Sequence, residues 1–376
     1  MRRQYTLFGW HLSYFTGKAL CYLRYKQVDF RLKPVNLLTL TWTIKKKTGA
    51  AVMPVLRSPQ GEWIQDTSVI IDRIEALIPD NPVIPATPVQ AFASRMLEAW
   101  GDEWWVPIAM HTRWNYPENY ALFEHDAGKA LLPWAPTFLQ KKAAAKPARF
   151  LRSMLPYVGI VPEQYDRMNR WTVKMLDALD AHFSATPFLL GERPSLGDFS
   201  LVGTMYGHLG RDPWPKRELI EPRKHLSAWL ERMKNPAPHS TGALLPNDGI
   251  PRTLDPVFYS VFHEFVPMVE AVAENTARYA AKHGLNQKLP RRVGQVTTTM
   301  AGEPFTRGAL PYMVWMLQRA LDTYHAMNAA DQANVRQWLS GYGAAHVLEL
   351  DLPRVNRVAL NVSVEKLPSN FLEQAA

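Results

Sequence analysis

An ordered alternation of strand and helix patterns in the first 82 residues constrains the fold of this chain more than any other feature. The β-type runs lie at residues 4–10, 30–35, 51–56 and 62–65, and the helical patterns at 18–26 and 67–77. The segment Ser58–Gly61, Ser-Pro-Gln-Gly, has the composition of a hairpin turn between the last two strands. This order predicts an α/β unit with a mixed sheet.

Strand patterns fade after a proline-rich linker at residues 80–88. Helical spacing then predominates, at residues 91–111, 164–183, 196–208 and 224–234. A loop-like stretch at 236–251 precedes further helical patterns at 257–282, 311–327 and 330–342. We therefore predict three domains: an α/β domain at 1–82, a helical domain at 90–240 and a helical extension at 250–376.

Composition narrows the cellular setting. Cys21 is the only cysteine among the 376 residues, so the chain can form neither an intrachain disulfide nor a zinc–thiolate cluster. This cysteine usage suits a reducing cytoplasm. With a single cysteine and no cluster of metal-ligand type, we expect no metal site. The sequence has no apolar run of about 18 residues and no signal-peptide pattern, so we expect no membrane span.

The net charge of +9 predicts a surface that attracts anions in general. No nucleic-acid-binding motif accompanies this charge, so we expect no nucleic-acid partner. The simplest interpretation is a solvated basic surface. Docking on an acidic membrane is an alternative, but the sequence shows no strong amphipathic basic helix to carry it.

Two short motifs have the chemistry of a ligand site. Pro54 interrupts the apolar run Val52–Leu56, and proline inside a strand marks an edge or a special backbone geometry. Asp66 and Thr67 then open the helix that follows the last strand. A carboxylate and a hydroxyl at a helix N-terminus lie beside free N–H groups and the positive end of the dipole, which suits a charged ligand. Alternatively, they only cap the helix.

A third motif covers residues 187–200. Its Ser195-Leu196-Gly197-Asp198 segment has the spacing of a capping box, with Asp in place of the usual Glu. We predict that this motif starts a core helix and has no catalytic role.

In this order and spacing, the three motifs resemble the glutathione S-transferase family over residues 4–235. The segment 206–213 resembles a bacterial branch with a long C-terminal extension. The resemblance implies a thioredoxin-like domain followed by an all-helical domain, with glutathione as co-substrate. It also implies a cis bond before Pro54, pairing of the Met53 backbone with the cysteinyl unit, and contacts of Asp66 and Thr67 with the γ-glutamyl end.

The same resemblance points to the loop after the first strand as the catalytic position. Family members place a Ser, Tyr or Cys there, where a hydrogen bond to sulfur increases the reactive thiolate fraction. Ser13 falls where the family's catalytic pair begins, and Tyr14 takes the second position, which is proline in the family. The donor is therefore Ser13 or Tyr14, with Ser13 favoured by the alignment and Thr16 within reach. Alternatively, Ser13 caps the first helix and Tyr14 packs beneath the second domain.

Three side chains of the first predicted helix of the helical domain, Trp104, Trp105 and His111, are expected to line an acceptor pocket for a small hydrophobic electrophile. Core packing is the alternative for each. Since no cysteine lies in the catalytic loop, conjugation or ether cleavage fits better than thiol transfer. We predict a cytoplasmic, homodimeric glutathione transferase of the detoxification type. The alternative is a non-catalytic ligand-binding or interaction protein of the same fold.

Overall fold

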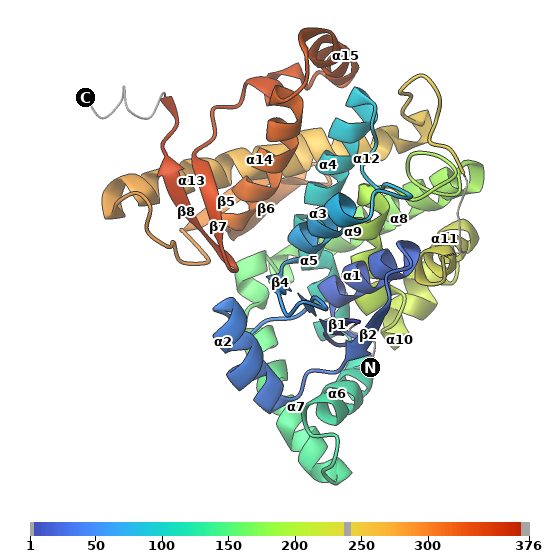
Figure 1. Ribbon diagram of the computed structural model, residues 1–376, viewed down its shortest axis with the longest axis vertical. Helices are drawn as coiled ribbons and strands as arrows, with labels where there is room; N and C mark the ends of the chain where they lie inside the picture. The colour runs from blue at the N-terminus through green and yellow to red at the C-terminus, as the bar shows by residue number, and fades with distance from the viewer. Residues whose placement is uncertain (1–3, 237–241, 370–376) are drawn as a thin grey trace. The chain divides into compact units, whose positions relative to one another are not determined.

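The computed structural model describes residues 4–236 and 242–369, and its contacts group the chain into two compact units (Figure 1). Unit 1 comprises residues 1–83, 105–155 and 198–241, and unit 2 comprises residues 84–104, 156–197 and 242–376. Each unit collects three separate stretches of chain. The units therefore cut across the linear domains predicted at 1–82, 90–240 and 250–376.

The sheet of unit 1 has four strands in the order β2-β1-β3-β4. Their bounds are β1 Tyr5–Phe8, β2 Phe30–Lys33, β3 Val55–Arg57 and β4 Trp63–Gln65. Strands β1 and β2 pair in parallel, whereas β3 runs antiparallel to both β1 and β4. The predicted mixed sheet is confirmed. Helices α1 (Tyr14–Tyr25) and α3 (Thr67–Leu77) pack on each other, and Tyr22 of α1 donates to Glu75 of α3 at 2.8 Å.

The other elements of unit 1 are helical. They are η1 Thr39–Ile44, α2 Lys45–Thr48, α5 Val106–Trp114, α6 Glu118–Leu131, α7 Thr137–Ser153, α9 Leu196–Thr204, η4 Met205–Leu209, α10 Pro213–Pro215, η5 Lys216–Ile220 and α11 Lys224–Lys234, where η marks π or 3₁₀ segments. Asp198 of α9 is fully buried and accepts from the Trp229 indole N–H of α11 at 3.0 Å. The acid of the third motif therefore contributes to packing, as predicted.

The single helix predicted over residues 91–111 is two helices, α4 (Pro88–Glu103) and α5. Pro107 lies in the first turn of α5, where its missing N–H costs nothing, but it cannot continue a ladder from α4. This prediction was wrong because the apolar spacing continues across the break while the hydrogen bonding does not.

Unit 2 contains most of the C-terminal extension. Its helical elements are α4, η3 Pro162–Gln164, α8 Tyr165–Ala185, η6 Arg252–Leu254, α12 Asp255–Ser260, η7 Val261–Phe265, α13 Val266–His283, α14 Tyr312–His325, α15 Ala329–Ser340 and η8 Ala345–Glu349, and η2 Leu155–Val158 joins it to unit 1. The predicted helices are confirmed, but two hairpins were missed: β5 Gln295–Met300 with β6 Glu303–Gly308, and β7 Arg354–Val358 with β8 Asn361–Lys366. Ala301 and Gly302 turn the first hairpin with φ of 53° and 80°.

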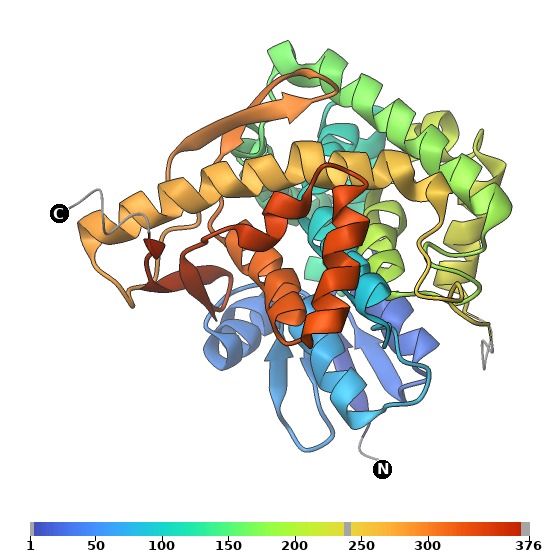
Figure 2. The ribbon, with the colours of Figure 1, turned by 90° about the horizontal axis from the view of Figure 1, so that it is seen from above.

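The extension shares a core with α4 and α8. Phe305 of β6 is fully buried with its ring centroid 5.8 Å from that of Trp104, and Trp104 also packs edge-on against Trp171 of α8. Figure 2 shows the β5–β6 hairpin lying along the long helix α13, with which β5 makes contact. Residues 242–369 are therefore an integral part of unit 2.

Replacing Phe305 by Ala should lower the free energy of unfolding by roughly 3–5 kcal/mol, because it leaves a cavity against Trp104. Chemical denaturation monitored by circular dichroism measures the change. Leu285→Ala is the control, since Leu285 is 40% exposed and its truncation should change stability by only about 0.5 kcal/mol. Equal losses in the two variants would contradict a shared core.

Candidate active site

The register of the sheet in unit 1 brings three loops to one edge. Phe8 pairs with Val55, and Val55 pairs with Gln65. The end of β1, the beginning of β3 and the end of β4 therefore lie side by side. The segments that adjoin them are the loop to Ser13, the Met53–Pro54 bond and Asp66.

The Met53–Pro54 peptide bond is cis, as the resemblance implies. Pro54 is buried and Met53 is half-buried. Within residues 4–236 and 242–369, Met53 makes no backbone–backbone hydrogen bond. Its N–H and C=O are therefore not used by the sheet, although only Pro54 separates Met53 from the first residue of β3.

Asp66 caps α3 from an unusual backbone position, with φ of 89°. Its Oδ1 accepts from the N–H groups of Ser68 at 2.9 Å and Val69 at 3.4 Å. Thr67 follows as a buried residue in the first turn of the helix. Asp66 therefore caps α3, and this cap holds its carboxylate at the edge where the three loops meet.

Lys18 of α1 is a charged residue near this helix end that the sequence analysis did not single out. Its side chain is fully buried, and its Nζ lies 3.5 Å from the Ser68 hydroxyl oxygen at the start of α3. The sequence did offer a signal, since Lys18 lies four residues before Tyr22, on the apolar side of the helix predicted at 18–26. A lysine on that side is expected to be buried, and a buried lysine needs a specific partner.

Ser13 and Tyr14 adopt different roles. Ser13 is half-buried at the N-cap of α1, where its Oγ accepts from the Thr16 N–H at 3.3 Å. Tyr14 is buried, and its hydroxyl accepts a hydrogen bond from Thr204 of α9. Its ring packs so close to Gly203 that a Cβ there would lie 2.9 Å from it. The Tyr14 hydroxyl is thus held within the helical layer of unit 1, and the Ser13 hydroxyl remains at the N-terminus of α1.

Two other titratable groups near this loop are neutral. Burial, together with Arg211 and Arg24, lowers the pKa of His11, whose Nδ1 lies 2.8 Å from the Tyr206 hydroxyl. Burial raises the pKa of the Cys21 thiol to about 12, so it offers no thiolate at neutral pH.

The predicted acceptor-pocket residues are enclosed by packing. Trp104 and Trp105 have no exposed surface, and they belong to different units. His111 is 2% exposed, with its Nδ1 2.6 Å from the Asn115 amide nitrogen. Core packing accounts for all three because none has surface to offer a ligand.

A different apolar group adjoins the sheet edge in unit 1. The loop residues Trp10 and Leu12 share a core cluster with Trp114 of α5, and the half-buried Met53 and Met110 pack against this cluster. Apolar surface thus lies beside both the Ser13 loop and the Met53–Pro54 bond.

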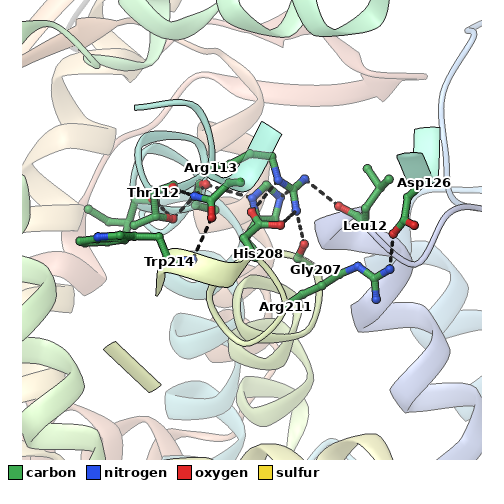
Figure 3. A network of polar contacts seen from close by, with 12 residues as sticks. Leu12, Thr112, Arg113, Asp126, Gly207, His208, Arg211 and Trp214 are labelled. Carbon is green, nitrogen blue, oxygen red and sulfur yellow. Dashed lines mark hydrogen bonds and ion pairs between the residues drawn. The ribbon is translucent and has the colours of Figure 1, made fainter. Parts of the chain in front are cut away.

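A buried arginine holds this loop in place (Figure 3). The Arg113 guanidinium of α5 forms a bidentate pair with Asp212, at 2.7 Å from Nε to Oδ2 and 3.0 Å from Nη2 to Oδ1. It also donates to the carbonyl oxygens of Leu12, at 2.8 Å, and Gly207. One side chain thereby connects α5, the loop before Ser13, and η4.

Further polar contacts surround this arginine. The His208 Nδ1 lies 2.9 Å from the Ala109 carbonyl oxygen, and burial together with Arg113 lowers the pKa of His208 well below its usual range. Arg211 forms an ion pair with Asp126 of α6. His208 is therefore neutral and does not add a second charge beside the guanidinium.

The sheet, the loops at its edge and the surrounding helices define a thioredoxin-like domain combined with a helical domain. Residues 7–82 match the family model of the glutathione S-transferase N-terminal domain, and residues 162–232 match that of the glutathione S-transferase C-terminal domain. The chain therefore contains the two domains that characterise the glutathione S-transferase family, as its motifs indicated. No curated protein matches it.

The chain is also similar to solved structures. These include the beta-etherase LigF from Sphingobium sp. strain SYK-6, with 21% identity over 62% of this chain and 96% of that chain and a TM-score of 0.45. A glutathione S-transferase from Methylobacterium radiotolerans in complex with glutathione sulfonate has 19% identity over 63% of this chain and 92% of its own, with a TM-score of 0.38. One from Rhodospirillum rubrum F11 has 16% identity over 67% and 98%, with a TM-score of 0.40. Similarity at this level does not bear on the substrate.

Replacing Arg113 by Met should lower the free energy of unfolding by roughly 3–5 kcal/mol, because it leaves the Asp212 carboxylate buried without its partner. Denaturant titration measures the change. The control is Arg217→Met, which breaks an exposed pair with Glu118 and should leave the free energy of unfolding nearly unchanged. The double variant Arg113→Met with Asp212→Asn should recover part of the loss; if it recovers none, the charge pair is not the cause.

Proposed function

We propose that this protein is a glutathione-dependent transferase that attacks an apolar or aromatic electrophile with the glutathione thiolate. The observation that carries the proposal is the strand register, which brings the ends of β1 and β4 beside the start of β3. The loop to Ser13, the Met53–Pro54 bond and Asp66 adjoin these three strand ends. Each segment offers one kind of group that the tripeptide needs: a hydroxyl, unpaired backbone groups, and a carboxylate at a helix N-terminus.

The proposed binding mode uses the charges at the start of α3. Asp66 pairs with the γ-glutamyl ammonium, while Thr67 and the N–H groups of the first turn receive the γ-glutamyl carboxylate. The ammonium of Lys18 beside Ser68 adds positive charge on the carboxylate side. The unpaired backbone groups of Met53 bind the cysteinyl unit.

The proposed reaction is a displacement or addition at carbon. The Ser13 hydroxyl donates to the glutathione sulfur, which lowers the thiol pKa, and the N-terminus of α1 favours the same negative charge. In ether cleavage the new S–C bond forms as the C–O bond breaks, and the leaving oxygen takes the electron pair and then a proton. The apolar side chains of Leu12, Met53 and Met110 favour a hydrophobic acceptor.

Two features of the proposal come from the family resemblance alone: a homodimer and a cytoplasmic location. The rival function is a non-catalytic ligand carrier, favoured by the enclosure of Tyr14 in the helical layer. Saturable glutathione binding without turnover of any member of an electrophile panel would select the carrier.

Asp66→Asn should weaken glutathione binding about tenfold or more, because it removes the charge that meets the ammonium. Stability should change by only a few tenths of a kcal/mol, roughly, since Asn caps a helix as well as Asp does. Isothermal titration calorimetry with reduced glutathione measures the affinity. Glu62→Gln, at an exposed ion pair with Arg73, is the control and should bind like the wild type. An unchanged affinity in Asp66→Asn would contradict the binding mode.

Ser13→Ala should raise the pKa of bound glutathione toward the free-thiol value of about 8.5, because the sulfur loses a donor. Tyr14→Phe should leave this pKa unchanged, since Thr204 holds the Tyr14 hydroxyl in the helical layer. Thiolate absorbance of the saturated complex as a function of pH gives the value directly. A shift in Tyr14→Phe without one in Ser13→Ala would assign the donor to Tyr14.

A further inference from the structure

Two segments of unit 1 carry an unusual distribution of charge. Residues 37–47 and 134–152 contain no Asp or Glu. They carry eight exposed cations: Lys45, Lys46, Lys47, Lys141, Lys142, Lys146, Arg149 and Arg152. We call the solvent-facing side of these two segments the basic apolar face.

The same 30 residues also expose large apolar side chains. Thirteen such side chains are exposed in the part of the chain that the structure describes, and seven lie here: Leu37, Leu38, Trp42, Trp134, Phe138, Leu139 and Phe150. Trp42 is 75% exposed and Phe138 is 68% exposed. Scattered single apolar residues are normal on a protein surface, but a concentration of this kind marks an interaction surface.

The two segments are anchored in one core. Ile44 of the first segment and Ala144 and Ala148 of the second belong to the same apolar cluster, and Leu40 packs against it (Figure 1, where α2 and α7 carry the labels). The inner sides of both segments are therefore packed. Their outer sides combine lysine and arginine with aromatic and aliphatic groups, although these segments lie about 100 residues apart in the sequence.

We propose that the basic apolar face docks on an anionic phospholipid bilayer. Helix α7 has the required composition, with five cations, no acid, Phe138 and Phe150 exposed, and alanines on its packed side. The lipid phosphates complement the cations, and the aromatic and aliphatic tips enter the boundary between headgroups and acyl chains. The basic helix that sequence reasoning did not find is thus α7, in which the stretch 141–147 is helical.

Two other occupants fit this face less well. A second copy of the chain would bring two basic surfaces together, and like charges repel. One acid of α6 adjoins each surface, since Glu124 lies 3.3 Å from the Lys141 ammonium. The phosphates of a nucleic acid would pair with the cations, but they would make no favourable contact with the exposed side chains of Leu37, Leu38 and Leu139. Among the described residues no helix is long and apolar enough to span a bilayer, so the proposed mode is interfacial.

Vesicle co-sedimentation of the full chain, without glutathione, tests the proposal. Vesicles of phosphatidylcholine and phosphatidylglycerol in equal parts should bind the protein, pure phosphatidylcholine should bind it at least about tenfold less, and 0.5 M salt should release it. Phe138→Ser with Phe150→Ser should weaken binding about tenfold, and so should the triple variant Lys142→Gln, Lys146→Gln, Arg149→Gln.

Matched controls lie on exposed positions of unit 2. Tyr259→Ser removes a 58% exposed ring, and Arg170→Gln, Arg252→Gln and Arg278→Gln together remove three exposed cations; both variants should bind like the wild type. Equal losses in controls and test variants would overturn the proposal, as would equal binding to neutral vesicles. Two further results would also overturn it. One is an affinity for double-stranded DNA that equals the affinity for anionic vesicles and that the two Phe substitutions leave unchanged. The other is concentration-dependent self-association, measured by light scattering, that these substitutions abolish.

Discussion

The buried guanidinium of Arg113 organises the part of unit 1 in which the candidate site lies. A guanidinium removed from water is stable only when its donors are satisfied, and here one carboxylate and two carbonyl oxygens satisfy them. The partners come from the loop before Ser13, from η4 and from the turn at Asp212. Since carbonyl oxygens accept along defined directions, these contacts fix the backbone of the loop as well as its distance from α5.

Close packing of glycines completes this arrangement. A Cβ on Gly207 would lie 2.8 Å from the Ser13 carbonyl carbon, and one on Gly17 would lie 2.7 Å from the Tyr206 ring. Only glycine allows η4 and α1 to approach to this distance. The segment 206–213 noted in the sequence therefore has a physical role, because Gly207 admits the loop, Asp212 neutralises Arg113, and Arg211 pairs with Asp126.

Sequence reasoning succeeded where the determinants are local. Alternating apolar residues and turn composition predicted the four strands of unit 1, and the Asp-Thr pair predicted the start of α3 at Thr67. Sequence reasoning failed where tertiary contacts determine the environment of a side chain. A tryptophan on a helix has the same local pattern whether it lines a pocket or fills a core, so the enclosure of Trp104 and Trp105 had no signal. The Arg113–Asp212 pair joins residues 99 positions apart, and no local pattern connects them.

The basic apolar face is a second feature that tertiary structure, and not the sequence alone, determines. A net charge of +9 on 376 residues indicates only a general attraction for anions. Electrostatic attraction at a surface decays over about 10 Å in 0.1 M salt, so local density matters more than the total. The fold creates that density by packing two distant acid-free segments on one core cluster, with aromatic side chains among the cations. The first segment leads from β2 toward Met53, so this part of the basic apolar face is continuous along the chain with one part of the proposed glutathione site.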